Sequence, residues 1–305
     1  MLTCVIGGDG FIGRRIVRLL AKERGDVVSL DVNTRTCFED LGKRVRSAKM
    51  DLTDFEAVVG AMASYRPEVI INLSYARESP PRQALKLNVL GMDNCFEAAR
   101  LTDVARVVYS SSVAVNGFQS SYGNVKIKQT DAPAPMNQYG VHKVFNEWQA
   151  HEYREKHGMT ITGIRPAHVS GTDKTVGMVD HVHCILKPAL GEKATLKYRD
   201  SMRCVIHCDD MAEVFVRVAL ATKPRHPVYN AGGEALSLGD IAEMVQKVIP
   251  AAEINFENAY GDKEKSGAYL FDSTRIADEF GFRFMPYEQR VAQMIDRVRQ
   301  GETLA

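Results

Sequence analysis

A tyrosine and a lysine, Tyr139 and Lys143, stand four residues apart in a stretch whose pattern predicts a helix over residues 138–157. Side chains at positions i and i+4 are neighbours on one helix face. An adjacent ammonium favours the phenolate, so we expect Lys143 to lower the tyrosine pKa from its usual value of ~10. The pair therefore predicts a general base that takes a proton from a substrate hydroxyl. Because the same spacing is common on solvated helix faces, a second feature must support it.

Three serines, Ser110, Ser111 and Ser112, supply that feature, because they follow the apolar run at residues 107–109. Ligands of open α/β sheets bind at the carboxyl ends of the strands, and the serines lie at such an end. A hydroxyl there can hold and polarise the oxygen whose proton Tyr139 removes. The alternative interpretation is a serine-rich turn after a strand. Together with the helical pair, the serines favour a catalytic group of Ser112, Tyr139 and Lys143.

A glycine-rich turn joins the first apolar run to the first expected helix, with glycines at Gly7, Gly8, Gly10 and Gly13. Glycine suits a tight turn whose backbone must approach a pyrophosphate that a side chain would block. The N–H groups and the positive end of the helix dipole then face the phosphates. Inside a strand–turn–helix unit, this spacing predicts a dinucleotide site.

An acidic residue, Asp31, ends the second expected strand. A carboxylate at this place can bind the adenosine ribose hydroxyls and repels a 2′-phosphate, so we expect NAD rather than NADP. Arg35, four residues later, could offset that preference. The alternative for Asp31 is a turn residue at a strand end.

Short β-rich runs alternate with longer amphipathic segments in the first half of the chain. The expected strands cover residues 2–6, 27–30, 69–73, 106–109 and 160–164. The expected helices cover residues 11–23, 55–64, 82–101 and 138–157. This order, with nearly continuous apolar strands, predicts an α/β fold with a doubly wound parallel Rossmann sheet covered by helices on both faces.

The alternation becomes less regular after residue 165. Strands are expected at 202–207 and 228–231, and helices at 182–190, 211–221, 238–248 and 286–299. These elements predict a smaller, partly interleaved α/β substrate lobe. We expect residues 1-165 plus 206-232 to form the NAD-binding domain, and residues 166-205 plus 233-305 to form the substrate-binding lobe.

The ordered motifs give the chain a resemblance to the extended short-chain dehydrogenases/reductases, the NAD-dependent epimerase/dehydratase family. The matching stretches are the glycine turn at 7–13, Asp31, Asp51 with Leu52, residues 88–91 beginning with Asn88, residues 110–117, Tyr139 to Lys143, residues 203–212, residues 229–232 and residues 272–273. They run in family order along nearly the full length. Such agreement is specific for the family and much less so for the reaction.

The resemblance implies a role for individual residues. Ser112 would orient the reacting oxygen, Tyr139 would be the acid/base, and Lys143 would bind the nicotinamide ribose. The other cofactor-binding residues expected from the resemblance are Gly7, Gly10, Phe11, Ile12, Gly13, Asp31, Asp51, Leu52, Arg77 and Asn88. The hydride chemistry itself belongs to NAD.

Departures from the family pattern narrow the reaction. Val113 and Ala114 stand where family dehydratases carry an Asp-Glu pair, so dehydration is not expected. His168 occupies the place of an asparagine that binds a sugar-nucleotide diphosphate, although a buried structural histidine is the simpler interpretation. Arg203 matches an arginine that often meets substrate phosphate, and it could equally hold a carboxylate.

Further residues are candidates for the substrate pocket. The predicted substrate-binding residues are Ser111, Asn116, His168, Met178, His181 and Arg203. His181 and His183 are two residues apart and do not share a helix face, so we expect no metal site.

Composition limits the partners. The formal net charge is +1 and no basic run occurs, so we expect neither nucleic acid nor membrane as a partner. The six cysteines form no CxxC pair, and we find no signal-peptide pattern and no apolar run near the ~20 residues of a membrane span. We therefore expect a reduced, cytoplasmic protein with a small-molecule substrate. The resemblance implies a homodimer built on residues 82–101 and 138–157.

Three functions remain open. The leading hypothesis is an NAD-dependent dehydrogenase acting on a secondary alcohol or ketone of a small polar substrate, such as a sugar or sugar acid. The alternative is a sugar-nucleotide 4-epimerase of the UDP-hexose type with tightly held NAD. The third is a cofactor-sensing protein without catalysis, which Tyr139 and Lys143 argue against.

Overall fold

The structure is a computed structural model that describes residues 1–305 except 24, 35–36, 77–78, 262–266 and 302–305. Among the described residues, no helix combines the length and the apolar composition that a membrane crossing requires.

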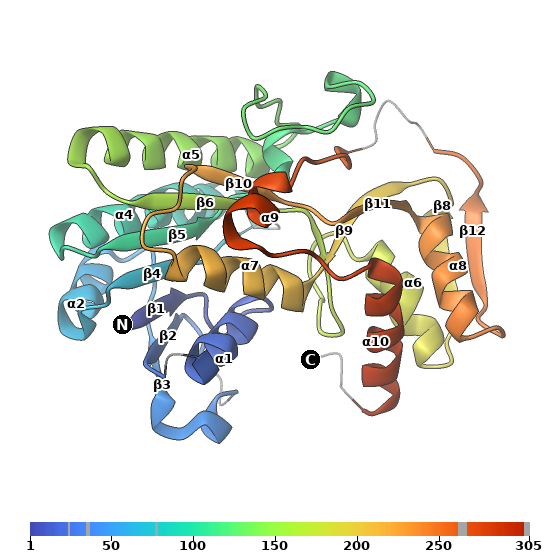
Figure 1. Ribbon diagram of the computed structural model, residues 1–305, viewed down its shortest axis with the longest axis horizontal. Helices are drawn as coiled ribbons and strands as arrows, with labels where there is room; N and C mark the ends of the chain where they lie inside the picture. The colour runs from blue at the N-terminus through green and yellow to red at the C-terminus, as the bar shows by residue number, and fades with distance from the viewer. Residues whose placement is uncertain (24, 35–36, 77–78, 262–266, 302–305) are drawn as a thin grey trace.

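A seven-stranded sheet forms the centre of the larger half of the molecule (Figure 1), with strand order β10-β6-β5-β4-β1-β2-β3. All neighbouring strands in it are parallel. The strands are β1 (Thr3–Ile6), β2 (Val27–Asp31), β3 (Val45–Lys49), β4 (Val69–Asn72), β5 (Arg106–Ser110), β6 (Ile161–Pro166) and β10 (Val228–Ala231). β1, β4 and β10 are buried throughout, as expected for strands covered on both faces.

Helices cover both faces of this sheet, each with its own apolar cluster. One face packs against α1 (Gly13–Glu23) and α7 (Cys208–Leu220), which also contact each other. The other packs against α2 (Phe55–Tyr65), α4 (Met92–Leu101) and α5 (Gln138–His157). The prediction of a doubly wound Rossmann sheet is therefore confirmed.

The smaller half holds two further sheets and a helical layer. One sheet joins β7 (His168–Ser170), β9 (Met202–His207) and β11 (Glu234–Ser237), and the other pairs β8 (Ala194–Tyr198) with β12 (Ile254–Asn258). A third apolar cluster lies among the three helices α6 (Asp180–Ala189), α8 (Leu238–Val248) and α10 (Tyr287–Arg299). In contrast, α9 (Thr274–Phe280) packs against β10 and α7 of the larger half.

Several elements differ from the sequence prediction. The first helix begins at Gly13 rather than at residue 11, because residues 11 and 12 still belong to the turn. The helix expected over 82–101 is made of α3 (Pro81–Leu85), the π-helical segment η2 (Lys86–Gly91) and α4. β3, β7, β8, β11, β12 and α9 were not predicted, since they are short and only partly buried. The short helices are η1 (Glu39–Arg44), η3 (Val113–Val115) and η4 (Gln119–Ser121).

Candidate active site

A cavity of about 430 Å³ lies at the carboxyl ends of the parallel strands. Its walls come from the glycine turn after β1, the residues after β4, the serines at the end of β5 and the start of α5. The segment 166–178, which leaves the central sheet after β6, forms the wall at the smaller half of the molecule. Strand ends are where open α/β sheets bind ligands, so this cavity is the candidate active site.

The glycine turn forms one end of the cavity and is shaped by backbone contacts. Gly7 has a φ of +76°, a conformation that favours glycine. A Cβ at Gly13 would lie 2.1 Å from the carbonyl oxygen of Gly7, so the turn closes only without a side chain there. The N–H of Arg14 bonds to the carbonyl of Gly10 at 3.0 Å, which starts α1 directly at the cavity.

This end of the cavity fits the pyrophosphate of NAD. Gly7, Gly10 and Gly13 line it together with Phe11 and Ile12, which were expected beside the cofactor. A Cβ at Gly10 would meet only the Gly7 carbonyl, at 3.2 Å, so glycine leaves this wall open. A helix N-terminus here offers N–H groups and a positive dipole end to an anion.

Asp31 ends β2, and its carboxylate accepts a hydrogen bond from the Asp9 backbone N–H at 3.3 Å. The glycine turn thus lies against the acid that would bind the adenosine ribose. Asp9 itself is buried, and the Ser29 hydroxyl donates to its carboxylate at 2.5 Å. We predicted no role for Asp9, although an acid between the glycines was visible in the sequence. Arg35 and Arg77 lie outside the described residues.

Five predicted cofactor residues are not among those that line the described part of the cavity: Asp31, Lys143, Asp51, Leu52 and Asn88. Asp51 is exposed and accepts the Thr53 N–H at 2.8 Å, while Leu52 is buried in the core. Asn88 is buried and bonds both ways with Ala76: its side-chain oxygen accepts the N–H at 2.7 Å and its amide donates to the carbonyl at 2.6 Å. Asn88 therefore fixes the chain after β4, one residue from Tyr75 in the cavity wall.

The structure brings the predicted catalytic residues together. Ser112 and Tyr139 both line the cavity, and Lys143 is buried with its ammonium 5.6 Å from the centre of the Tyr139 ring. The Ser112 hydroxyl accepts the Ala114 N–H at 3.1 Å. Because a hydroxyl has one proton to donate, this contact leaves the Ser112 O–H able to point at a ligand oxygen. Asn137 caps α5 by accepting the Gly140 N–H at 2.9 Å, which fixes the first turn carrying Tyr139.

Around Lys143 lies a buried polar network, centred on Glu147, that the sequence analysis did not predict. The ammonium donates to the Ser110 carbonyl at 2.6 Å. Burial lowers the pKa of Lys143 to about 8, and the charge of Glu147 opposes that shift. Glu147 also pairs with Arg165 at 2.7 Å and accepts the Ser111 hydroxyl at 2.6 Å. Glu147 lies four residues after Lys143, the helical spacing that already linked Tyr139 to Lys143, and this signal could have revealed it.

The predicted substrate residues divide into two sets. His168 and Met178 line the cavity. Ser111 also borders it, but the Ser111 hydroxyl is engaged by Glu147. Asn116 is fully buried and donates to the Tyr122 hydroxyl at 3.1 Å, which gives it a structural contact.

The remaining two predicted substrate residues, Arg203 and His181, contact neighbours within the chain. Arg203 makes a two-pronged ion pair with Asp180 at the start of α6, with Nε 3.1 Å from one carboxylate oxygen. Burial raises the pKa of Asp180, but hydrogen bonds from His181 and Arg203 outweigh burial and hold it below its usual value. The pair is therefore charged at neutral pH. His181 is fully buried, with Nε2 3.3 Å from the Val169 carbonyl oxygen.

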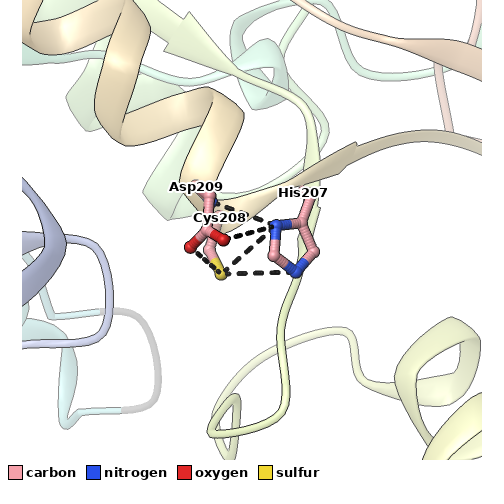
Figure 2. A group of neighbouring side chains, drawn as sticks. All are labelled: His207, Cys208 and Asp209. Carbon is pink, nitrogen blue, oxygen red and sulfur yellow. Dashed lines mark hydrogen bonds and ion pairs between the residues drawn. The ribbon is translucent and has the colours of Figure 1, made fainter. Parts of the chain in front are cut away.

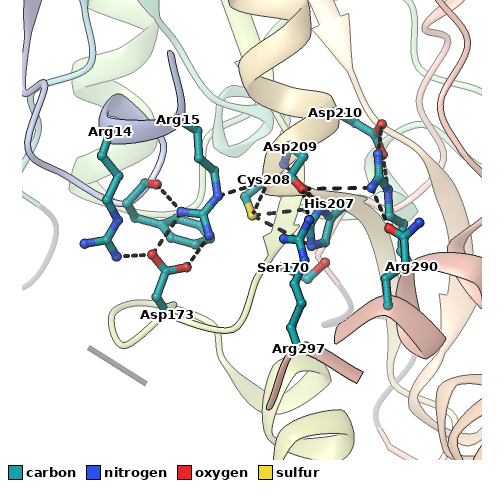
Figure 3. A network of polar contacts seen from close by, with 12 residues as sticks. Arg14, Arg15, Ser170, Asp173, His207, Cys208, Asp209, Asp210, Arg290 and Arg297 are labelled. Atoms are coloured by element: carbon teal, nitrogen blue, oxygen red, sulfur yellow. Dashed lines mark hydrogen bonds and ion pairs between the residues drawn. The ribbon is translucent and has the colours of Figure 1, made fainter. Parts of the chain in front are cut away.

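Three neighbouring residues, His207, Cys208 and Asp209, have ligand-type atoms within 4.8 Å of one another (Figure 2). His207 caps α7, since its Nδ1 accepts the Asp209 N–H at 3.2 Å. Burial raises the pKa of the Cys208 thiol to about 12, so the sulfur stays protonated. Arg15 and Arg297 lie 3.1 and 2.8 Å from the Asp209 carboxylate (Figure 3). Two guanidinium groups on one carboxylate oppose the binding of a metal cation by this group of residues.

Arg14 and Arg15, which follow the last glycine of the turn, tie α1 to the segment after β7. Both pair with Asp173 in the cavity wall, and the Arg15 contact is 2.7 Å (Figure 3). This connection between the cofactor end and the substrate end of the cavity was not predicted, because residues 14 and 173 are far apart in the sequence.

Comparison with known proteins assigns the family. The model of the NAD dependent epimerase/dehydratase family matches residues 3–232. UDP-glucose 4-epimerase of Mycolicibacterium smegmatis is 32% identical over 234 residues, covering 71% of this chain and 72% of that protein.

Solved structures share the fold at lower identity. A partial-consensus L-threonine 3-dehydrogenase superposes with a TM-score of 0.87 at 20% identity, covering 98% of this chain and 100% of that one. The NAD complex of UDP-glucose 4-epimerase from Thermus thermophilus superposes with a TM-score of 0.84 at 23% identity, covering 99% and 100%. The chain thus belongs to the NAD-dependent epimerase/dehydratase family and is an NAD-dependent oxidoreductase of the extended short-chain dehydrogenase type.

Proposed function

We propose that the protein is an NAD-dependent dehydrogenase that interconverts a secondary alcohol and a ketone of a small polar substrate. The observation that carries this proposal is the ion pair between Arg203 and Asp180. An arginine that must bind a sugar-nucleotide diphosphate has to be available, whereas this one is matched by a carboxylate of its own chain. Val113 and Ala114 provide no acid or base for dehydration.

The proposed mechanism assigns one task to each catalytic side chain. Ser112 donates its O–H to the reacting oxygen. The Ser112 oxygen accepts the Ala114 N–H, and this contact does not use the hydroxyl proton. Tyr139 accepts the hydroxyl proton during oxidation and returns it during reduction. Lys143, with its ammonium 5.6 Å from the ring centre, supplies the positive charge that favours the Tyr139 phenolate. NAD held by the glycine turn would accept the hydride in oxidation, and NADH would donate it in reduction.

The cofactor contacts are part of the same proposal. The glycine turn would hold the pyrophosphate and Asp31 the adenosine ribose, with Asp51, Leu52 and Asn88 supporting the adenine side. The division into an NAD-binding domain of residues 1-165 plus 206-232 and a substrate lobe of 166-205 plus 233-305 also belongs here. The separation of the seven-stranded sheet from the two smaller sheets supports this division, except that α9 packs against β10 and α7 of the larger half.

A substrate screen tests the dehydrogenase. NADH formation would be followed by its absorbance with a panel of alcohols, sugars, sugar acids and L-threonine, the last because of the structural neighbour. We expect at least one compound to reduce NAD in the wild-type protein and not in Tyr139→Phe. A complete panel without NADH formation by folded, NAD-binding protein would reject this function.

The second candidate is a UDP-hexose 4-epimerase with tightly held NAD. The 32% identity to the mycobacterial UDP-glucose 4-epimerase favours it. Mass spectrometry of gently denatured protein separates the two candidates. Stoichiometric NAD released together with a UDP-sugar supports the epimerase, and an empty site that binds added NAD reversibly supports the dehydrogenase.

We further propose a homodimer formed through α5 and the helices before it. Val141, Phe145 and Trp148 lie on one face of α5 and are 51%, 49% and 62% exposed, and Leu90 nearby is 55% exposed. Apolar side chains at this spacing are typical of a helical interface. Light scattering of Trp148→Glu protein should show a monomer, while Tyr260→Glu, at an exposed aromatic of the smaller half, should leave the dimer intact. A monomeric wild type would reject this interface.

We place the protein in the reducing cytoplasm. All six cysteines fall within the described residues and each is unpaired, five of them buried. Burial raises the pKa of Cys4, Cys95, Cys184, Cys204 and Cys208 to about 12. Thiols of this kind are inert core residues rather than a disulfide framework. Fractionation of the source cells with an antibody to the protein tests the placement, and recovery in a membrane or exported fraction would contradict it.

A further inference from the structure

The segment 166–178 forms the cavity wall on the side of the smaller half and includes His168 and Met178. Its first part is fixed by the sheet, because β7 pairs with β9 and the Ser170 hydroxyl donates to the Ile206 carbonyl at 3.1 Å. β7 ends at Ser170, and the chain then leaves the sheet. The contacts that hold the wall beyond this point therefore decide the shape of the cavity where a substrate would bind.

Asp173 connects this part of the wall to the first turn of α1. Arg15 donates to both carboxylate oxygens, at 2.9 and 2.7 Å, and Arg14 pairs with one of them (Figure 3). Asp173 is buried, and the side chains of Arg14 and Arg15 are only 18% and 14% exposed. Two-pronged pairs of arginine with a carboxylate are strong, and low exposure reduces their screening by salt. We therefore expect this contact to restrain the wall.

Arg15 is itself fixed to the glycine turn. It donates to the Phe11 carbonyl at 2.7 Å, and its Nε lies 3.1 Å from the Asp209 carboxylate. The wall also packs closely on the same turn, since a Cβ at Gly171 would lie 2.8 Å from the Phe11 ring. One guanidinium thus contacts both the turn proposed to hold the pyrophosphate and the wall proposed to face the substrate.

The charge of Asp173 has to be matched for a pyrophosphate to bind beside it. Asp173 and Arg14 line the cavity together with the glycine turn, whereas Arg15 is not among the described residues that line it. An unmatched carboxylate in the lining would repel the pyrophosphate. Because Arg15 reaches the carboxylate from behind the lining, the pair of Arg15 with Asp173 is compatible with a cofactor in the cavity.

We propose that Asp173 is a positioning residue that couples the cofactor site to the substrate wall. When NAD occupies the glycine turn and orders the first turn of α1, Arg15 transmits that order to Asp173 and so to residues 171–178. By reciprocity, a substrate that contacts this wall strengthens NAD binding by the same factor. The inference rests on the proposed NAD site at the glycine turn and does not depend on which alcohol is the substrate.

Hydrogen exchange measured by mass spectrometry tests the coupling without turnover. Peptides covering residues 171–178 would be compared with and without NAD, at concentrations that calorimetry shows to be saturating for each protein. In wild type, NAD should slow exchange in this segment by ~10-fold, a usual size for coupling between two sites. In Asp173→Asn the slowing should fall below about twofold, and Asp173→Glu, which keeps the charge, should restore part of it.

The matched control is Asp40→Asn. Asp40 pairs with Arg18, also on α1, at 2.7 Å, but this pair is exposed and neither residue is among those that line the cavity. The control removes an acid from an arginine of the same helix, and NAD should slow exchange in residues 171–178 as it does in wild type. Thermal unfolding of every variant shows which ones are folded, and Asp173→Ser would replace an unfolded Asp173→Asn.

Kinetics give a readout that a purely structural contact would not change in the same way. With the best alcohol of the substrate screen, Asp173→Asn should raise KM by ~10-fold and change kcat by less than about threefold. The reason is that the wall binds a part of the substrate that does not react. A lower kcat at unchanged KM would overturn the positioning role.

The outcomes separate this inference from the proposed function. Equal slowing by NAD in wild type and Asp173→Asn, or no slowing in either although both bind NAD, overturns the coupling and leaves the dehydrogenase intact. Slowing that depends on Asp173, in a protein that forms no NADH from any alcohol, supports the coupling and counts against the dehydrogenase. A wild type that does not bind NAD contradicts both.

Discussion

The two ends of the cavity are built in different ways. The cofactor end is made mainly by backbone, with glycines at 7, 10 and 13 at the N-terminus of α1. Asp31, at the end of β2, lies against this turn through the Asp9 N–H. The substrate end depends on side chains that contact distant segments, as in the pair of Asp173 with Arg15 and the hydrogen bond from the Cys204 N–H to His168. A site made of backbone groups can be recognised in the sequence from the spacing of its glycines. A site made of side chains depends on which residues the fold brings together, and the sequence does not show this.

The largest expected effect lies where the two ends meet. Tyr139→Phe should lower kcat by ~10²- to 10⁴-fold, because the proton acceptor is removed while the ring remains. NAD affinity should change by less than about threefold, since the loss concerns chemistry rather than the glycine turn. Stopped-flow kinetics and calorimetry would measure the two quantities. A variant with near wild-type kcat would mean that another group moves the proton.

A large effect is also expected at the cofactor end. Gly13→Ala would place a Cβ 2.1 Å from the Gly7 carbonyl oxygen and 2.9 Å from Gly8, so the turn must open. We expect NAD binding to weaken by ~10- to 100-fold, which corresponds to about 1–3 kcal/mol of strain.

The control is Gly60→Ala, at an exposed position of α2 with nothing within 4 Å of the added Cβ. It should leave NAD binding unchanged and raise the free energy of unfolding by ~1 kcal/mol. Unchanged NAD affinity in Gly13→Ala would show that the turn does not carry the pyrophosphate.

Asp180→Asn sharpens the comparison at the substrate end. Removing the carboxylate leaves Arg203 with an unmatched charge, so the affinity for UDP, measured by calorimetry, should rise by ~10-fold. Glu213→Gln, which removes the acid from the exposed Arg217 pair on α7, is the matched control and should have no effect. If UDP bound tightly to wild type and no better to Asp180→Asn, the pair would not be what excludes a diphosphate.

The smallest expected effect is a shift in pH dependence. Burial lowers the pKa of Lys143 to about 8, so the cation beside Tyr139 is present below that pH and lost above it. The charge of Glu147 raises this pKa, so Glu147→Gln should move the alkaline limb of kcat to lower pH by about one unit. Rate profiles across neutral and alkaline pH would show it. An unchanged limb would assign the alkaline titration to a different group.

The larger half was predicted well because its signals are local. Buried strands such as β1 read as apolar runs, and the glycines at 7, 10 and 13 and the pair of Tyr139 with Lys143 lie within single segments. The prediction of the site was incomplete where the contacts join residues that are far apart in the sequence. No pattern in the sequence joins Arg14 to Asp173, and Arg203 was expected to meet substrate before its partner Asp180 was known. Short, half-buried strands such as β11 and β12 also lack a clear period.

The central claim is net, reversible redox chemistry by a protein that exchanges its cofactor. The most direct measurement incubates purified protein with NAD and the best alcohol of the screen and quantifies NADH and ketone together. The account predicts one NADH for each ketone formed, with NAD binding reversibly. Conversion of UDP-glucose to UDP-galactose by protein that keeps its NAD and forms no NADH would contradict it.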